Sequence, residues 1–405
     1  MKHIMIVCMH FYPVQFRVND IALELVSRGY KVTVVTGIPN YPDAKFTKGY
    51  GLFKKRRENY EGIDIIRLPI FPRGNNSLSL VLNYFSFNFS GWFFSLFTRI
   101  KADHVFIYGT SPLLKAMVGL RYAKRRKIGS TLYVMDLWPE SVQYAGGISN
   151  HSVLKYLTKK MEKIYRLSTH ILISSRSFIS SIKEKHVPDD KIIYWPQAAE
   201  ELFTKESNEK ASEVIRDNRL NLIFAGTIAV AQGLDILPET AVLLKRDHKK
   251  VRFIIVGDGR ERESLVEKVN ELGVSDYFQF TGKVPVAKVP SYFNQADAAI
   301  LTLTDTPIFR LTIPAKLQSY MTYGIPILTN VQGEVKEIIE ESKSGLVASS
   351  YSVESFYEMI NHFMKCTKEE RKTMSFNGKN YANKYFDRNQ LMDQLENIMH
   401  QSKGV

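Results

Sequence analysis

Short apolar runs alternate with longer amphipathic stretches along this chain, and this order predicts a repeated strand–helix pattern. Near the N-terminus, we expect a strand at residues 4–8, a helix at 18–28 that ends at Gly29, and a second strand at 31–36. A strand, a helix and another strand in this order imply a parallel sheet with helices on its faces. The pattern continues with expected strands at 63–68, 104–108, 131–135 and 169–174, and expected helices at 113–124 and 153–167.

A polar stretch at residues 204–219 separates this set from a second one. There, strands are expected at 220–225, 251–256, 278–281 and 298–303, and helices at 234–246 and 261–272. At 405 residues, of which 44% are apolar, the chain is long enough for two domains with cores of their own. We therefore expect an α/β protein with two similar domains around a central cleft, at residues 1–200 and 201–375, and C-terminal helices at 376–405.

Residues 304–329 hold the strongest candidate for an anion site. A polar loop leads into a short helix expected at 315–323, which Gly324 ends because glycine readily takes the left-handed conformation. The backbone N–H groups at the start of a helix, with Lys316 one turn in, suit a phosphate or diphosphate. The alternative is an ordinary helix N-terminus with a surface lysine.

The net positive charge of the chain comes from its first half. Residues 1–200 hold 29 of the 55 Lys and Arg and 14 of the 41 Asp and Glu, a balance of +15, whereas residues 201–405 have a balance of −1. An anionic partner is therefore expected for the first half only, either nucleic acid or an acidic membrane surface. No recognised nucleic-acid motif is present, so we expect a membrane and no nucleic acid.

The stretch at residues 78–100 is long and strongly aromatic. Asn83, Asn88 and several serines interrupt it, so we do not expect it to span a membrane. Basic residues flank it, among them Arg73, Arg99 and Lys101, and apolar aromatics edged by cations suit a helix that lies in a membrane interface. The alternative is a core helix, and the two can coexist on opposite faces.

Cysteine usage and the N-terminus indicate the compartment. The two cysteines, Cys8 and Cys366, lie far apart and suggest neither a disulfide framework nor a metal site, which fits a reducing cytoplasm. The apolar run at the N-terminus is too short for a signal peptide.

Several loop motifs follow one another at a characteristic spacing. They are FAGTIAVAQGLDIL at 224–237, IVGDGRER at 255–262, FTGKVP at 280–285 and ADA at 296–298. Together they resemble the retaining, nucleotide-sugar-dependent glycosyltransferases of family 4, and the opening FYP at 11–13 and RGYKVTVVTG at 28–37 match as well. PNYP at 39–42 and DLWPES at 136–141, with RLP at 67–69 and PRG at 72–74, resemble the subgroup often assigned as N-acetylfucosaminyl transferases of capsule and O-antigen assembly.

This resemblance implies the GT-B fold, in which two Rossmann-like domains face a central cleft and the second holds most of the donor. It implies that the final helix crosses back to the first domain. It also implies that no metal or other cofactor is needed, because backbone amides and basic side chains neutralise the leaving diphosphate. The implied donor-binding residues are Arg17, Gly226, Thr227, Gln232, Gly233, Arg260, Val284, Arg310, Thr312, Ile313, Pro314, Lys316 and Gln318.

The chain departs from the family pattern at three of these positions. Where the family commonly has two glutamates, this chain has Arg310 and Gln318. Gln318 can still hydrogen-bond ribose hydroxyls, whereas Arg310 is either a contact to the diphosphate or an acidic sugar, or a surface residue. Gln232 stands where a lysine is common, so Lys316 becomes the best remaining cation for the phosphates, with Arg260 second.

The remaining site residues each have an alternative. Asp136 is expected at the end of a strand, where it is either a base or acceptor-orienting group, or the N-cap of a helix. Glu140 either supports Asp136 or lies in the first turn of that helix. Arg17 contacts either phosphate or solvent, and the backbone of Val284 contacts either a uracil edge or nothing beyond an ordinary turn.

The expected function is that of a retaining, metal-independent glycosyltransferase. It would move a sugar, such as the N-acetylated amino sugar N-acetylfucosamine, from a UDP-sugar to a polyprenyl-diphosphate-linked sugar in bacterial capsule or O-antigen assembly. It would be cytoplasmic and peripheral on the inner face of the plasma membrane. The alternatives are a UDP-sugar epimerase of similar fold and an inactive membrane-attached scaffold.

Overall fold

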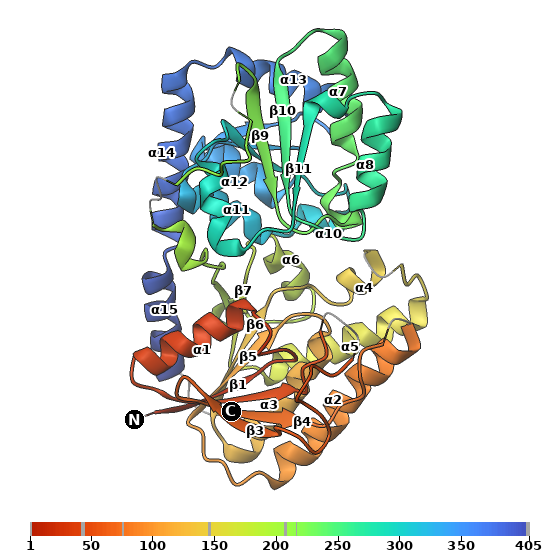
Figure 1. Ribbon diagram of the computed structural model, residues 1–405. Helices are drawn as coiled ribbons and strands as arrows, with labels where there is room; N and C mark the ends of the chain where they lie inside the picture. The colour runs from red at the N-terminus through yellow and green to blue at the C-terminus, as the bar shows by residue number, and fades with distance from the viewer. Residues whose placement is uncertain are drawn as a thin grey trace. The chain divides into compact units, whose positions relative to one another are not determined.

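The computed structural model describes residues 2–41, 45–74, 77–144, 147–205, 209–215 and 217–401 (Figure 1). The chain divides into two compact units. Unit 1 comprises Met1–Trp195 and Asn389–Val405, and unit 2 comprises Pro196–Arg388. The divisions thus follow Trp195 and Arg388, whereas the boundaries were expected after residues 200 and 375.

Unit 1 contains an eight-stranded sheet with the strand order β3-β4-β2-β1-β5-β6-β7-β8. Every neighbouring pair is parallel except β3 with β4, so the parallel sheet predicted from the strand–helix order is confirmed. The elements of this unit are β1 (His3–Val7), α1 (Arg17–Ser27), β2 (Lys31–Gly37), β3 (Arg57–Tyr60), β4 (Ile63–Leu68), α2 (Ser77–Phe97), β5 (His104–Gly109), α3 (Ala116–Arg126), β6 (Gly129–Val134), α4 (Glu140–Tyr144), α5 (His151–Leu167), β7 (His170–Ile173), α6 (Phe178–Lys183), β8 (Ile192–Tyr194) and α15 (Arg388–Gln401).

The last helix, α15, lies beside α1 within unit 1 (Figure 1). Arg28, directly after α1, forms an ion pair with Glu396 at 2.8 Å, and the Tyr30 hydroxyl lies 2.9 Å from the His400 ring. The indole N–H of Trp195 donates to the Leu391 carbonyl at 2.7 Å. These contacts attach the end of the chain to its beginning.

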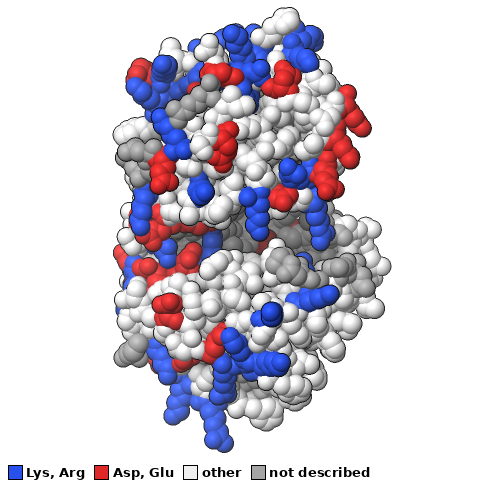
Figure 2. Space-filling view, viewed as in Figure 1, with Lys and Arg blue, Asp and Glu red and all other residues white. Residues whose placement is uncertain are grey.

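The aromatic helix α2 buries one stripe of its surface and exposes the rest. Asn83, Phe87 and Ser95 are buried, and at Gly91 the helix lies so close to α3 that a Cβ atom would be 2.3 Å from Val118 Cγ2. Large apolar side chains on the remaining surface are 39–74% exposed, namely Leu78, Val81, Leu82, Phe85, Phe89, Trp92, Phe93, Leu96 and Phe97. Over this region Figure 2 shows a surface with few charged side chains.

Neither α2 nor any other helix of the described residues is long and apolar enough to cross a membrane.

Unit 2 contains a six-stranded, fully parallel sheet with the order β11-β10-β9-β12-β13-β14. Its strands alternate between two apolar cores: Leu222 and Phe224 contribute to one, and Ile223 to the other. Helices therefore cover both faces, as a buried parallel sheet requires. The elements are β9 (Leu220–Ala225), α7 (Ile236–Arg246), β10 (Val251–Val256), α8 (Arg262–Glu271), β11 (Phe278–Gly282), α9 (Val289–Phe293), β12 (Ala298–Leu301), α10 (Pro307–Arg310), α11 (Ala315–Tyr323), β13 (Ile327–Thr329), α12 (Glu334–Ser342), β14 (Gly345–Val347), α13 (Val353–Lys365) and α14 (Lys368–Tyr385).

Candidate active site

Two glycine loops approach each other closely at the carboxyl edge of the unit 2 sheet. Gly226 follows β9 and Gly257 follows β10, and a Cβ atom on Gly257 would lie 1.9 Å from the Gly226 carbonyl oxygen. Only glycine permits this approach, because both residues also have φ in the positive range, +151° and +142°. The loops expose their backbone at the edge where parallel α/β sheets bind ligands.

Beside these loops lies a pocket of about 680 Å³. Four of the predicted donor-binding residues line it: Gly226, Thr227, Arg260 and Val284. The sequence motifs at 224–237, 255–262 and 280–285 therefore converge on one pocket. The lining also includes residues that the sequence analysis did not single out, Val256, Gly257, Asp258, Gly259, Lys283, Val286 and Val289.

Lys316 lies against the same loop from the first turn of α11. A Cβ atom on Gly226 would be 2.5 Å from Lys316 Cε, so the lysine stem crosses directly over this glycine. The ammonium donates a hydrogen bond to the Gln232 amide oxygen and lies 4.1 Å from the centre of the Phe224 ring. Burial lowers the pKa of Lys316 to about 7. The structure thus brings together Gly226, Gln232 and Lys316, and the ammonium lacks much of the hydration that would stabilise its charge.

Other predicted residues around α11 are engaged in local contacts. The amide of Thr312 donates to the Phe309 carbonyl at 3.3 Å, and its hydroxyl donates to the Ile308 carbonyl at 2.8 Å. Ile313 is buried, and Pro314 is the N-cap of α11 without a side-chain capping bond. Thr312, Ile313 and Pro314 therefore shape the entry to the helix, and their donor contacts stay predictions.

The two positions that depart from the family pattern have different environments. Arg310 is exposed and forms a bidentate pair with Asp305, at 2.8 and 2.7 Å. Gln318 is only 1% exposed, and with its amide nitrogen toward the start of its own helix it donates to the Pro314 and Ala315 carbonyls at 3.1 Å. Neither placement identifies a substrate contact, so both roles stay predictions.

Gly233 ends the loop of Gly226 and lies against another loop of the same edge. A Cβ atom on Gly233 would lie 3.0 Å from the backbone of Leu303 and Thr304. The two loops are also joined by a hydrogen bond that the Thr304 amide donates to the Ala231 carbonyl at 3.1 Å.

In unit 1, Asp136 lies just after β6, at the carboxyl edge of that sheet. Its Oδ2 accepts a hydrogen bond from the Ser111 amide at 2.7 Å, and the Ser111 hydroxyl accepts one from the Trp138 indole at 2.9 Å. Helix α4 begins four residues later, at Glu140, so Asp136 is not the residue that caps it. The N-cap alternative is wrong, and the catalytic role stays a prediction.

Glu140 is the first residue of α4, as the first-turn alternative has it. Its Oε1 accepts hydrogen bonds from Lys185 Nζ at 2.7 Å and from the Ser181 hydroxyl at 2.5 Å. Because Lys185 and Ser181 are both buried, these contacts fasten α4 to the region of α6. Support of Asp136 by Glu140 stays a prediction.

The sequence analysis did not name two titratable residues that lie at this edge of the unit 1 sheet. Lys115 is completely buried, its ammonium donates to the Thr110 hydroxyl at 2.5 Å, and burial lowers its pKa to about 8. His10 follows β1, and burial together with the charges of Lys115 and Arg73 lowers its pKa to about 3. A lysine inside the apolar run PLLKAM at 112–117 was the available signal.

Arg17, the first residue of α1, lies in the same unit. Burial raises the pKa of Tyr108, and the positive charge of Arg17 opposes this shift. Arg17 thus acts electrostatically on the end of β5.

Comparisons with known proteins agree with these motifs. Residues 205–381 match the family model described as "Glycosyl transferases group 1". The probable glycosyltransferase WbjE of Pseudomonas aeruginosa is 26% identical over 68% of this chain and 70% of its own. The putative colanic acid biosynthesis glycosyl transferase WcaI of Escherichia coli K12 is 24% identical over 74% of this chain and 75% of its own. The alpha-monoglucosyldiacylglycerol synthase of Acholeplasma laidlawii is 24% identical over 80% and 77%.

Solved structures share the fold at low sequence identity. Sucrose-phosphate synthase from Thermosynechococcus elongatus superposes with a TM-score of 0.73 at 12% identity, over 99% of both chains. HepE from Anabaena, in a complex with UDP-glucose, superposes with a TM-score of 0.68 at 14% identity, over 99% of this chain and 100% of its own. The GT-B fold implied by the sequence is therefore confirmed.

Fold and motifs together define the class. The chain has the GT-B fold, its residues 205–381 are similar to the group 1 glycosyltransferases, and its relatives include a glycosyltransferase named for colanic acid biosynthesis.

Proposed function

We propose that this protein transfers a sugar, with retention of configuration, from a UDP-sugar to a lipid-linked acceptor in the assembly of a bacterial surface polysaccharide. The acceptor would be a polyprenyl-diphosphate-linked sugar at the inner face of the plasma membrane. The donor sugar would be an N-acetylated amino sugar such as N-acetylfucosamine, in keeping with the motifs PNYP and DLWPES.

The observation that carries the proposal is the position of Lys316 over Gly226, beside the pocket of the glycine loops. A diphosphate there would meet an ammonium whose burial already disfavours its charge, so the anion would restore the protonated state. The related fold of HepE holds UDP-glucose, which supports a UDP-sugar as the donor. The uridine base would lie against the backbone of Val284, and the diphosphate toward Lys316.

Transfer requires that charge be stabilised as the bond between sugar and diphosphate breaks. Negative charge grows on the leaving diphosphate in the transition state, and a fixed cation and backbone amides stabilise it without reorganisation. Lys316 would supply the cation, with Arg260 of the pocket nearby in the same loop set. Asp136, at the edge of the unit 1 sheet, would orient the acceptor hydroxyl or accept its proton.

Charge and surface support a lipid-linked acceptor. The basic balance of residues 1–200 and the exposed aromatics of α2 fit the headgroup region of an anionic bilayer. One relative is named for the synthesis of a glucosylated diacylglycerol and another for colanic acid biosynthesis, so both names are in keeping with this acceptor class.

Metal independence is part of the proposal. Among the described residues, no three His, Cys, Asp or Glu side chains are grouped so that they could hold a metal ion. The diphosphate charge would instead be met by Lys316 and the helix and loop amides.

The test is UDP release from a panel of UDP-sugars by purified protein in EDTA, with and without a bacterial lipid extract that contains polyprenyl-diphosphate-linked sugars. We expect one UDP-sugar to release UDP faster when the extract is present, and NMR to show a product with the anomeric configuration of the donor. An inverted product, or a UDP-sugar isomer formed without any acceptor, would contradict the proposal, the latter in favour of an epimerase. Nucleotide binding without turnover on any donor would instead indicate an inactive scaffold.

A further inference from the structure

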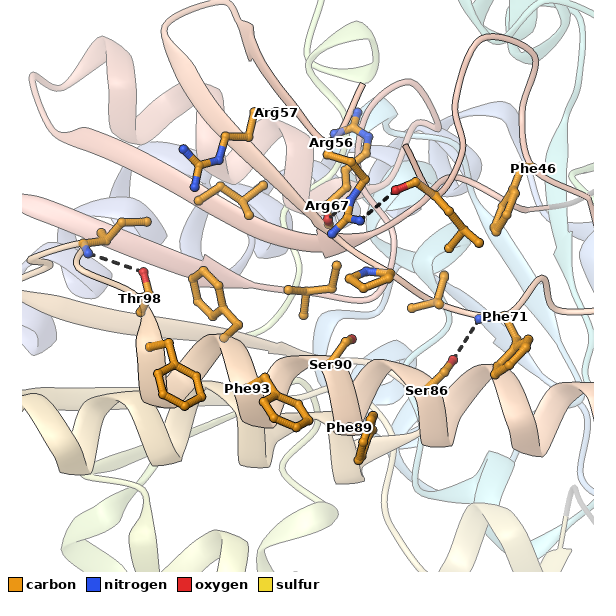
Figure 3. Close-up of a pocket in the computed structure, with 18 of the residues that line it drawn as sticks. Phe46, Arg56, Arg57, Arg67, Phe71, Ser86, Phe89, Ser90, Phe93 and Thr98 are labelled. Carbon is orange, nitrogen blue, oxygen red and sulfur yellow. Dashed lines mark hydrogen bonds between the residues drawn. The ribbon is translucent and has the colours of Figure 1, made fainter. Parts of the chain in front are cut away.

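An apolar groove of about 1210 Å³ runs along α2 in unit 1, and neither Asp136 nor His10 is among the residues that line it. In Figure 3, α2 forms one wall with Phe89 and Phe93, and Arg56 and strand β3 with Arg57 lie opposite. The apolar lining residues are Phe46, Leu52, Ile66, Leu68, Pro69, Ile70, Phe71, Pro72, Phe89, Phe93, Phe94, Phe97 and Ile100. The groove thus offers a mostly hydrocarbon surface that is open to solvent.

The groove face of α2 is distinct from the face that packs on α3. Phe89, Phe93 and Phe97 recur every fourth residue, and their ring centres are 5.1 and 6.3 Å apart. A row of residues four apart forms a continuous stripe along a helix. The stripe contains three large rings at least 43% exposed, which a protein surface does not usually leave uncovered in such a row.

The two serine hydroxyls in the groove floor have their bonds within the protein, whereas Arg67, which also lines the groove, has two buried nitrogens, Nε and Nη1, without a hydrogen-bond partner. The Ser86 hydroxyl accepts from the Phe71 amide at 2.9 Å and donates to the Asn83 carbonyl at 2.8 Å, and the Ser90 hydroxyl donates to the Phe87 carbonyl at 3.2 Å. A hydrocarbon occupant would therefore leave these two hydroxyls satisfied.

Positive charge is concentrated at one end of the groove. Arg57 lies directly opposite Ile66 across the β3–β4 pair, so both side chains are on the groove face of the sheet. Arg57 and Ile100 also border a second hollow of about 580 Å³, which adds Lys101 and Lys31 together with the carboxylates of Glu58 and Asp64. Arg99 lines the groove beside them.

The two end arginines are available for a ligand. The side chains of Arg57 and Arg99 are exposed, and among the described residues neither side chain has a hydrogen-bond or ion-pair partner. Arg56 differs, because it donates to the Leu52 carbonyl at 3.0 Å and to the carbonyl of Arg67. A groove with hydrocarbon walls and two unpaired cations at its end is complementary to a chain that ends in a phosphate.

We propose that this groove binds one acyl chain of an anionic membrane phospholipid, with the lipid phosphate held by Arg57 and Arg99. The outer side chains of α2, such as Phe85, Trp92 and Leu96, continue the apolar surface beyond the groove and would lie in the interface of the same bilayer. The site is separate from the donor pocket, so it would anchor the enzyme whatever sugar it transfers.

The test measures binding of dodecyl phosphate, below its micelle concentration, to the full chain by calorimetry. Dodecyl maltoside, inorganic phosphate and farnesyl phosphate serve as comparison ligands. The variants are R57Q/R99Q, which removes the phosphate contacts, and S90W, which fills the groove. K249Q/K250Q in unit 2 removes the same net charge elsewhere, and V81A alters an exposed side chain of α2 that does not line the groove. UDP binding verifies that each variant is folded.

We expect saturable binding of dodecyl phosphate to the wild type and no binding of inorganic phosphate. R57Q/R99Q should weaken binding about 25-fold, since each basic residue near an anionic lipid contributes about fivefold. S90W should weaken it at least tenfold, since each methylene kept out of the groove costs about fourfold. K249Q/K250Q and V81A should leave the affinity unchanged.

Vesicles test the same site in a bilayer. The wild type should bind phosphatidylcholine vesicles that contain phosphatidylglycerol more tightly than pure phosphatidylcholine vesicles, and R57Q/R99Q should lose most of this preference while K249Q/K250Q keeps it. Wild-type affinity in S90W, equal losses in the two charge variants, or binding of farnesyl phosphate with none of dodecyl phosphate would each overturn the inference. UDP release could persist in all these cases, so the proposed transfer would stand independently.

Discussion

Each unit holds a lysine at the carboxyl edge of its parallel sheet, and burial lowers the pKa of both, but their surroundings differ. Lys316 crosses over Gly226 beside an open pocket, whereas Lys115 is completely enclosed and donates to Thr110. The loop after β9 begins with Gly226, which leaves room for Lys316 beside the backbone. The loop after β1 has no glycine at this point, since it begins with Cys8 and continues to His10. A buried cation becomes a binding group only where the backbone beside it is open to a ligand.

In the proposed function, the edge in unit 2 binds the donor and the edge in unit 1 serves the chemistry at the acceptor. The largest expected effect separates these two tasks. Asp136→Asn should lower the rate of sugar transfer by about 10²–10⁴-fold, because a positioned base is lost. UDP affinity, measured by calorimetry, should not change. A transfer rate within threefold of the wild type would contradict the assigned role of Asp136.

The two lysines can be compared directly by substitution. Lys316→Met should weaken UDP binding about 30-fold, since a charge-assisted hydrogen bond to phosphate is lost, worth about 2 kcal/mol. Lys115→Met should leave UDP affinity unchanged. Both variants should unfold at no lower temperature than the wild type at pH 7, because each removes an ammonium whose burial disfavours its charge. Equal losses of UDP affinity in the two variants would remove the distinction between the edges.

The pH dependence of UDP binding should follow Lys316. In the free protein its pKa of about 7 lies far below the usual lysine value, and a bound diphosphate would raise it. UDP should therefore bind most tightly below pH 7 and lose about tenfold in affinity between pH 6 and pH 8, with proton uptake on binding at pH 8. Calorimetry in buffers of different ionisation enthalpy measures this uptake. A flat profile in the wild type, or the same slope in Lys316→Met, would show that another group is responsible.

The smallest effect is expected at Arg310. Because its guanidinium is exposed and paired with Asp305, Arg310→Gln should change UDP affinity by no more than about threefold. Binding by Asp305→Asn provides the control, since that variant releases the arginine while keeping its charge. A loss in Arg310→Gln as large as in Lys316→Met would place the arginine on the diphosphate and weaken the special role of the lysine.

Much of the fold was predictable because it follows from local patterns. The strands expected at 63–68, 220–225 and 251–256 have these bounds in the structure. The last two are mostly apolar runs in a sheet buried on both faces, whereas the first also contains the exposed Asp64. Strand β3 was not predicted, because it is an edge strand of polar residues, RENY at 57–60. Helix α2 was expected from its length, but only packing decides which of its stripes is buried.

The candidate site was likewise predictable only where it follows from local sequence patterns. The glycine loops were predictable, since Gly226 and Gly257 are needed for a backbone approach that is encoded in consecutive residues. The burial of Lys115, the inward position of Gln318 and the pairing of Arg310 with Asp305 were not, because each depends on where separate elements meet. Motifs thus located the pocket of the glycine loops, whereas the ionisation of the residues around it required the structure.

The central claim is that the edge of unit 2 recognises a diphosphate through Lys316. The most direct measurement is calorimetric titration of the wild type and Lys316→Met with UDP and with UMP, in EDTA. We expect UDP to bind the wild type at least tenfold more tightly than UMP, and this ratio to fall toward one in the variant. Equal binding of UDP and UMP by the wild type, or an unchanged ratio in the variant, would contradict this claim.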